Sequence, residues 1–258
     1  MLKRNDADSG PRIGCAGWSI GSAHALRFGD GSSMLARYAT CFNAVEINTS
    51  FYRPHQFRTY ARWAGSVPAT FRFSVKIPKS ISHEARLARC GAMLDRFVEE
   101  IGGLGEKLGG VLLQLPPSLA FDARVAATFF ALLRRRLSAP IACEPRHASW
   151  FDASRDALWA RYAIARVGAD PPPVPQADDA RGAGPWRYWR WHGSPQRYYS
   201  AYSDSALLSL AKTVRHNTPA RVTPWIIFDN TALGHATADA CRLQALLAKD
   251  ANALHGDS

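Results

Sequence analysis

The chain has 258 residues, which is long for one ordinary domain, short for two, and close to the roughly 250 residues of a single α/β barrel. Hydrophobic residues make up 47% of the chain and charged residues 21%, a balance that excludes an intrinsically disordered protein. The formal net charge of +11 favours an anionic ligand or a polyanion such as nucleic acid.

Between flexible tails predicted at 1–11 and 250–258, short apolar or β-branched runs alternate with amphipathic ones. The runs typical of strands lie at 12–17, 44–48, 71–77, 109–115, 140–144, 163–168, 186–192 and 224–229. Helices are predicted at about 32–41, 56–65, 91–108, 122–137, 152–162, 203–216 and 235–249. Several strand runs are almost continuously apolar, as expected for parallel strands that are covered on both faces.

One segment, from Pro171 to Gly184, interrupts this alternation. It reads PPPVP and then DDARGAG, and proline fixes φ and removes a backbone donor, so we expect no regular structure there. Asp122 and Ser203 are expected to cap the helices that follow them. Eight strands alternating with about seven helices predict an α/β fold, a single TIM-like (β/α)8 barrel over residues 12–249.

The cysteines and the apolar runs indicate the compartment. Cys15, Cys41, Cys90, Cys143 and Cys241 are scattered and form no CxxC pair, which predicts free thiols in a reducing compartment. The N-terminus lacks the apolar stretch of a secretory signal, and no apolar run approaches the roughly 20 residues of a membrane helix. We therefore expect a cytoplasmic protein without membrane contact, and the sequence indicates no obligate protein partner.

Polar and ionisable side chains stand where the apolar strand runs end. They are Trp18, Glu46, Asn48, Lys76, Gln114, Glu144, Arg146, Asp170, Arg190, His192, Asp229 and Asn230. Side chains alternate along a strand, so Glu46 shares a face with Asn48, and Arg190 shares one with His192. The carboxyl ends of barrel strands form the active-site face, so we expect these groups to gather around one cavity rim.

Glu46, Lys76, Glu144 and His192 are the candidate catalytic residues. The two glutamates could act as general base and acid if their surroundings separate their pKa values, and His192 could shuttle a proton. Lys76 and Arg146 could clamp an anion. Alternatively, Glu46–Lys76 and Glu144–Arg146 could be buried ion pairs that only hold the strand ends together.

Loops after the strands supply further candidates for ligand binding, and capping or packing explains them nearly as well. Tyr198, Tyr199 and Tyr202 could stack on a base or a sugar ring, and His235 could lie at a helix N-terminus that favours an anion. The complete predicted substrate-binding set is Trp18, Asn48, Tyr52, Arg53, His83, Gln114, Arg146, His147, Arg190, Tyr202, Asp229, Asn230 and His235.

No cofactor is predicted. The sequence contains neither a GxGxxG dinucleotide fingerprint nor a GxxxxGK[ST] phosphate loop, and no HxH or HExxH metal spacing. Glu46, Glu144, His192, Asp229 and His235 are suitable ligands for a divalent ion, so a metal stays open as an alternative. Lys76, Arg146 and Arg190 would oppose it by their positive charge.

Eight stretches taken together resemble the YecE-like domain of unknown function 72 (DUF72) family, from Ile13 to about Leu246. They are IGCAGWS (13–19), VEINTSFYR (45–53), FRFSVKIPKSISHEARL (71–87), LLQLPPSL (112–119), CEPRHASWF (143–151), RWHG (190–193), YYSAYSD (198–204) and FDNTALGHA (228–236). The resemblance implies a TIM-like barrel and no established reaction. Ile20 replaces the family's usual tyrosine, and Asp229 replaces the first of two paired asparagines.

The preferred hypothesis is an enzyme that acts on a small anionic substrate, namely a sugar acid, a phosphate ester or a phosphorylated sugar. The alternative is a nucleic-acid-binding or phosphodiester-processing protein, with or without a metal. Schiff-base chemistry through Lys76 and a non-catalytic sensor or scaffold are further alternatives.

Overall fold

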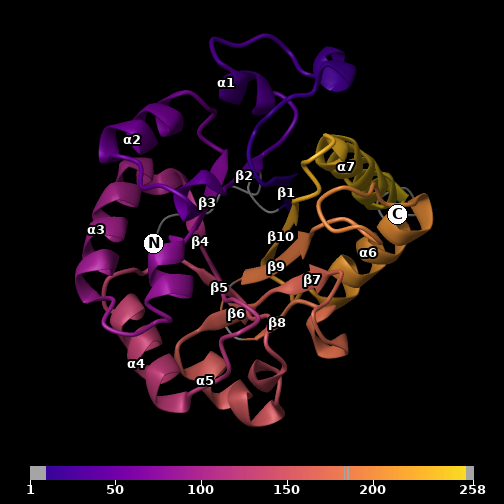
Figure 1. Cartoon of the computed structure of the whole chain (residues 1–258). Coiled ribbons are helices and arrows are strands. Elements are labelled where there is room, and N and C mark those ends of the chain that lie inside the picture. The colour runs from indigo at the N-terminus through magenta and orange to yellow at the C-terminus, as the bar shows by residue number, and fades with distance from the viewer. Residues whose placement is uncertain (1–9, 183, 185, 254–258) are drawn as a thin grey trace.

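The structure, a computed structural model, describes residues 10–182, 184 and 186–253, over which strands and α-helices alternate (Figure 1). The strands are β1 (Arg12–Cys15), β2 (Ala44–Ile47), β3 (Arg72–Lys76), β4 (Leu108–Gln114), β5 (Ile141–Glu144), β6 (Ile164–Arg166), β7 (Gly168–Asp170), β8 (Arg181–Gly182), β9 (Trp186–Trp191) and β10 (Thr223–Phe228). The α-helices are α1 (Met34–Tyr38), α2 (Phe57–Gly65), α3 (Gly91–Ile101), α4 (Ala123–Arg134), α5 (Asp156–Arg161), α6 (Asp204–Asn217) and α7 (His235–Ala253).

These strands form two sheets, which Figure 1 shows at the centre with α2 to α7 around them. One sheet has the order β1-β10-β9-β7 and is parallel. The other has the order β2-β3-β4-β5-β6-β8, with only β8 antiparallel to its neighbour. A bridge between Ala16 and Glu46 joins β1 to β2, and Val167 alone separates β6 from β7. The predicted α/β class is confirmed, whereas the strand pairings of the described residues do not close into one barrel sheet.

The predicted strands and helices are present, with ends that differ by a few residues. The strand predicted at 163–168 is divided, because β6 pairs with β5 whereas β7 pairs with β9. The helix predicted at 91–108 ends at Ile101 and continues as a 3-10 helix through a glycine-rich stretch. Asp122 and Ser203 accept hydrogen bonds from backbone N–H groups of the first turns of α4 and α6, which confirms both predicted caps.

Two boundary predictions need correction. The segment 171–184 is not entirely irregular, because a 3-10 turn forms at Pro175–Ala177 and β8 pairs antiparallel with β6. Helix α7 runs to Ala253, into the predicted tail at 250–258. The rest of that tail, at 254–258, and most of the predicted N-terminal tail, at 1–9, lie outside the described residues.

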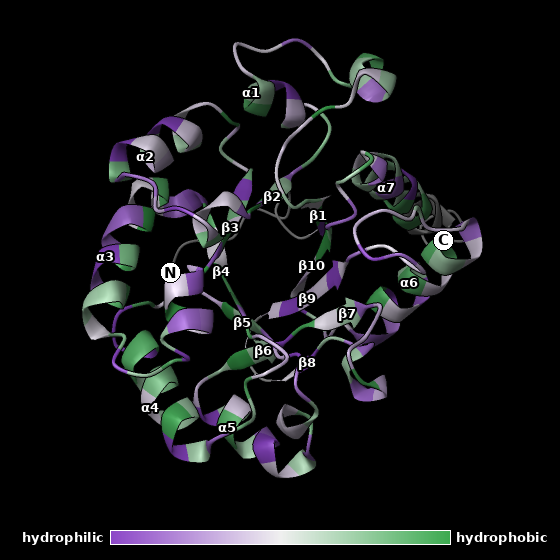
Figure 2. Ribbon diagram, viewed as in Figure 1, coloured by the Kyte–Doolittle hydropathy of each residue, from purple (hydrophilic) through white to green (hydrophobic). Residues whose placement is uncertain are grey.

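Two apolar clusters position the strand ends. The larger lies between the sheets and the amphipathic helices, whose mixed hydropathy is visible in Figure 2 on α3, α4 and α5. The smaller cluster joins alternate residues of both sheets: Ala44, Leu112, Ala142, Ala165, Val167, Trp186, Tyr188, Trp225 and Ile227. Alternation then puts Glu46, Glu144 and Asp229 two residues beyond Ala44, Ala142 and Ile227, on this same face. The interior is therefore apolar along the strands and charged at their carboxyl ends.

Gly109, at the start of β4, lies against the indole of Trp225. A Cβ at this position would lie 2.7 Å from Trp225 Cη2, and 3.3 Å from Arg72 Cβ. We therefore expect Gly109→Ala to lower the free energy of unfolding by roughly 1–3 kcal/mol in urea denaturation, because the ring is fixed by its neighbours. Gly65→Ala is the control, since a Cβ there meets no atom within 4 Å. Equal stability of the two variants would contradict this account.

Candidate functional site

Seven ionisable side chains from distant parts of the chain meet at the carboxyl ends of the strands. This charged cluster consists of Glu46, Lys76, Glu144, Arg146, Arg190, His192 and Asp229. Six of them are buried, and the side chain of Arg146 is 9% exposed. Buried charges are costly unless they are paired, so the pairing pattern decides what each group can do.

Arg190 is the centre of the cluster and is fully buried. Its Nη2 and Nε donate to the two oxygens of Glu46 at 2.7 and 2.9 Å, and its Nη1 donates to Glu144 Oε2 at 2.8 Å. Its Nη2 also lies 3.0 Å from Asp229 Oδ2. Burial alone would lower the pKa of Arg190, but the three carboxylates outweigh it and raise this pKa well above the ordinary value. Every nitrogen of the guanidinium is thus engaged inside the protein.

Glu46, predicted as catalytic, has no free oxygen. Oε1 accepts from Arg190, and Oε2 accepts from both Arg190 and the hydroxyl of Tyr188 at 2.9 Å. The Tyr188 hydroxyl also lies 2.7 Å from Ser74 Oγ. No ion pair joins Glu46 to Lys76 in the described part of the chain, so that predicted pair is wrong: the register of β9 brings Arg190 to Glu46 instead. The sequence analysis did not name Tyr188 or Ser74. Each lies two residues before a named residue of the same strand, Arg190 or Lys76, so the alternation of side chains places it on the same face.

Glu144 forms the predicted ion pair with Arg146. Its Oε1 accepts from Arg146 Nη2 at 2.7 Å and lies 3.0 Å from His192 Nε2, while its Oε2 accepts from Arg190. Burial would raise the pKa of Glu144, but the charges of Arg146 and Arg190 outweigh it and hold this pKa well below the ordinary value. Glu144 therefore stays ionised, with both oxygens occupied.

His192 lies between two carboxylates and is fully buried. Its Nδ1 is 2.9 Å from Asp229 Oδ2, and its Nε2 is 3.0 Å from Glu144 Oε1 and 3.3 Å from Arg146 Nη2. With a proton on Nδ1, the ring can either donate from Nε2 to Glu144 or accept there from Arg146. Both ring nitrogens are thus within hydrogen-bonding distance of a partner.

Asp229 offers a carboxylate oxygen that is not engaged. Its Oδ2 contacts Arg190 and His192, whereas no hydrogen bond to Oδ1 is present within 10–182, 184 and 186–253. Burial would raise the pKa of Asp229, but Arg190 and His192 outweigh it and lower this pKa. Oδ1 is therefore an ionised acceptor that a ligand could reach.

Lys76 differs from the other cations of the cluster because, among the described residues, no carboxylate pairs with its amine. Its Nζ lies 4.2 Å from the centre of the Phe51 ring, and the residue is only 5% exposed. Burial and, second, the charge of Arg190 lower the pKa of Lys76 to about 8, against the opposing effect of the carboxylates. The pKa of His83 is lowered by burial and then by the charges of Lys76 and Arg146, so both cations act electrostatically on this ring.

Three predicted ligand-binding residues are occupied by structural contacts. The Tyr202 hydroxyl donates to Asp170 Oδ1 at 2.7 Å and accepts from the Gly193 N–H. His147 Nδ1 accepts from the Ser149 N–H and caps the 3-10 helix at 148–150. The side-chain amide of Asn230 donates to Ser200 O and Asp239 Oδ2, which ties β10 to α7. The structure keeps all three outside the charged cluster.

The remaining predicted residues form no hydrogen bond or ion pair with the cluster in the part of the chain that the structure describes. Trp18 packs edge-on against Trp63. His235 is the first residue of α7, as expected. Gln114 ends β4 beside Glu144 in register, and the amide oxygen of Asn48 is buried without a partner among the described residues. Tyr52, 69% exposed, and Arg53 line a cavity of about 300 Å³, which Phe51 also lines.

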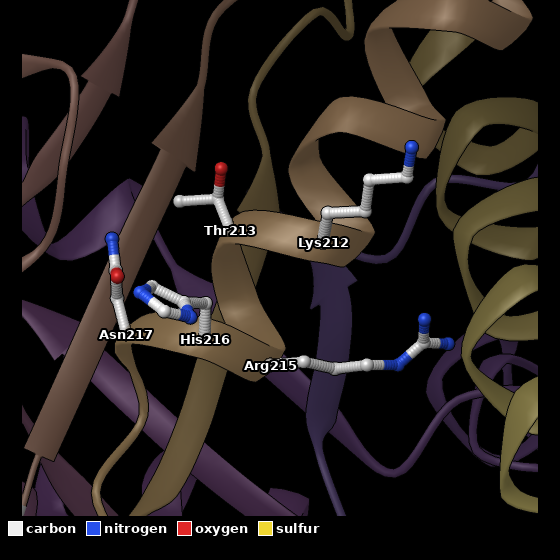
Figure 3. Close-up of a pocket in the computed structure, with 5 residues that line it drawn as sticks. All are labelled: Lys212, Thr213, Arg215, His216 and Asn217. Atoms are coloured by element: carbon white, nitrogen blue, oxygen red, sulfur yellow. The ribbon is translucent and has the colours of Figure 1, made fainter.

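A larger cavity lies away from the cluster, at the end of α6. It has a volume of about 600 Å³ and is lined by Lys212, Thr213, Arg215, His216 and Asn217. Figure 3 shows that these side chains point in different directions from the helix. This end of α6 precedes β10, whereas Asp229 follows it, so about 20 Å of strand separates the two places.

The described residues hold neither a metal-binding cluster nor a membrane-spanning helix. Within 10–182, 184 and 186–253, no group of three or more His, Cys, Asp or Glu side chains could hold a metal ion. In the same residues, the helices are too short or too polar to cross a bilayer.

The comparisons with known proteins identify relatives over nearly the whole chain. A family model described as "Protein of unknown function DUF72" matches residues 12–257. The UPF0759 protein YecE of two Escherichia coli strains is 36% identical over 86 residues, which is 33% of this chain and 32% of YecE. The match thus spans about a third of the length of these curated relatives.

Two solved structures share the fold. A DUF72 family protein from Thermotoga maritima has a TM-score of 0.78 at 24% identity and covers 93% of this chain and 99% of its own. One from Enterococcus faecalis has a TM-score of 0.77 at 22% identity, with coverages of 93% and 98%.

Proposed function

The chain belongs to the DUF72 family of proteins of unknown function, and on that premise we propose that it binds and turns over a small anionic substrate at the charged cluster. The substrate classes that fit are a sugar acid, a phosphate ester or a phosphorylated sugar. The observation that carries the proposal is the buried amine of Lys76, which has no carboxylate partner in the described residues although three carboxylates lie close by.

The proposal includes a barrel architecture. The bridge from Ala16 to Glu46 and the continuity of β6 with β7 through Val167 would link the two sheets at both of their meeting points. The apolar cluster between the sheets is what the filled interior of a TIM-like (β/α)8 barrel contains. In such a barrel the charged cluster lies at the carboxyl-end mouth, where active sites are found.

The pairing pattern explains why an anion is favoured over a cation. Glu46 and Glu144 have no free oxygen, so their charges are already neutralised by arginines. Two donors of the charged cluster have no hydrogen-bond partner among the described residues. They are Nζ of Lys76 and Nη1 of Arg146, whose guanidinium bonds through Nε and Nη2. An ammonium and a guanidinium in one charged cluster can both form charge-assisted hydrogen bonds to a carboxylate or a phosphate group.

The same pattern assigns the proton chemistry to Lys76 rather than to Glu46 or Glu144. A general acid or base works best with a pKa near the operating pH, and burial lowers the pKa of Lys76 to about 8. Oδ1 of Asp229 would accept a hydrogen bond from a substrate hydroxyl and orient it. His192, held between Asp229 and Glu144, would orient both carboxylates by hydrogen bonds.

The test is sulfate binding by isothermal titration calorimetry, with sulfate as the probe for a tetrahedral anion. We expect Lys76→Met to weaken binding by about 10- to 100-fold, because one charge-assisted hydrogen bond is lost. Lys79→Met is the matched control: Lys79 is half exposed and pairs with Glu84 at 3.2 Å. Equal affinity of the Lys76 and Lys79 variants would remove the proposal.

A further inference from the structure

Two cysteines far apart in the chain lie side by side. Cys41, between α1 and β2, has its Sγ 3.8 Å from Sγ of Cys241, which is on α7. The amide of Gln244, one turn further along α7, donates to the Cys41 carbonyl at 3.2 Å and holds the helix against this segment. All five cysteines are free, as the sequence predicted. The two sulfur atoms thus need to approach by less than 2 Å to reach bonding distance.

Cys41 is the more reactive thiol of the pair, because its hydrogen bond with Cys241 lowers its own pKa and raises that of Cys241. The hydrogen bond from the Cys241 thiol lowers the pKa of Cys41 to about 7 against the effect of burial, and the charge of Arg27 assists. Both residues are half-buried, so a small oxidant can reach them. In contrast, burial raises the pKa of Cys15 to about 12 and that of Cys90 to about 11. Thiolates react and thiols do not, so oxidation should begin at Cys41.

We propose that Cys41 and Cys241 form a peroxide-oxidisable pair that closes to a disulfide. The Cys41 thiolate attacks one oxygen of hydrogen peroxide, the O–O bond breaks, and the other oxygen leaves as water with a proton. Cys241 then attacks the sulfenic sulfur of Cys41, the S–O bond breaks, and a second water leaves with the Cys241 proton. The sulfur atoms lose two electrons in total, and the peroxide is reduced to two waters.

The disulfide would join two segments, α7 and the residues before β2, that adjoin residues of the charged cluster. Helix α7 begins shortly after Asp229, and its Asp239 accepts a hydrogen bond from Asn230. Cys41 lies three residues before β2, and Glu46 is the second-last residue of that strand. Oxidation would therefore tie α7 to the segment that leads into β2. The inference concerns the thiols alone and stands or falls independently of the proposed function.

The test treats the full-length protein with hydrogen peroxide, blocks the remaining thiols with N-ethylmaleimide and maps the peptides by mass spectrometry. We expect a cross-linked peptide pair joining Cys41 to Cys241. In Cys241→Ser the sulfenic acid on Cys41 has no partner, so dimedone should label Cys41. In Cys41→Ser no disulfide should form, and Cys241 should stay alkylatable.

Cys90→Ser is the matched control and should keep the cross-link, because Cys90 takes no part in the pair. Circular dichroism of each variant shows that it is folded before oxidation. Oxidised wild-type protein in which Cys41 and Cys241 are both still alkylated would overturn the proposal. Preferential oxidation of Cys15, Cys90 or Cys143 would overturn it as well.

Discussion

Replacing Arg190 with Met is expected to lower the free energy of unfolding by about 3–5 kcal/mol. The substitution removes the guanidinium that bonds to both oxygens of Glu46, to Glu144 and to Asp229. All three carboxylates are buried, so they would lose a cation and gain no water. The methionine has a similar volume, and the loss would therefore come from charges left unpaired rather than from a cavity.

Urea denaturation at neutral pH measures this loss, and two further variants define its origin. Arg190→Lys should recover only part of the stability, because an ammonium cannot make the two parallel hydrogen bonds to Glu46. Arg187→Met, on the same strand, is the control. Among the described residues, the Arg187 side chain bonds only to the neighbouring Trp186 carbonyl, and we expect a change below about 1 kcal/mol. If Arg190→Met and Arg187→Met were equally stable, Arg190 would not be the centre of the cluster.

The sequence predicted the places of the charged residues but not their partners. Alternation along β2 and β9 is a local property, and it correctly assigned Glu46 and Arg190 to the polar face of their strands. Glu144 and Arg146 are two residues apart, so their pairing was predictable as well. The partner of Glu46, in contrast, lies 144 residues away, and depends on how the two sheets face each other.

The same limit applies to the loops. His147 and Tyr202 are residue types that bind ligands, yet each satisfies a backbone N–H in the structure. Sequence alone does not separate these roles, because both use the same hydrogen-bonding atoms. Lys76 is the reverse case. A lysine could have formed an ion pair with Glu46, but in the structure Arg190 forms that pair. The Lys76 amine is therefore left for another partner.

The Lys76 amine, which no carboxylate of the described residues pairs with, would make the proposed anion binding dependent on pH. Sulfate keeps its charge across the neutral and alkaline range, so a change in its affinity reports on the protein. Burial lowers the pKa of Lys76 to about 8, and the ammonium form, which attracts sulfate, is lost as the pH rises above this value. If only the ammonium form binds, affinity should fall by about 30-fold between about pH 7 and about pH 9.5, the ratio of the protonated fractions.

Lys76→Arg is the control, because a guanidinium stays charged over this range and its affinity profile should be flat. A midpoint near 10.4, the ordinary lysine value, would show that the amine is not desolvated. Calorimetry in buffers of different ionisation enthalpy gives a second readout: binding should take up protons near pH 8, since a bound anion favours the ammonium. Wild-type protein and Lys76→Arg with the same pH profile would contradict the assignment.

The lowered pKa of Lys76 also affects the stability of the fold. This effect separates a loss of sulfate binding from a loss of folding in Lys76→Met. Between about pH 8 and the ordinary lysine pKa near 10.4, the unfolded chain binds more protons at Lys76 than the folded chain. The desolvation cost of the amine is therefore fully present below pH 8 and fades as the pH rises toward 10.4. Lys76→Met carries no such cost, so we expect it to be at least as stable as the wild type at neutral pH. Weak sulfate binding by this variant would then reflect the missing charge and not a loss of fold.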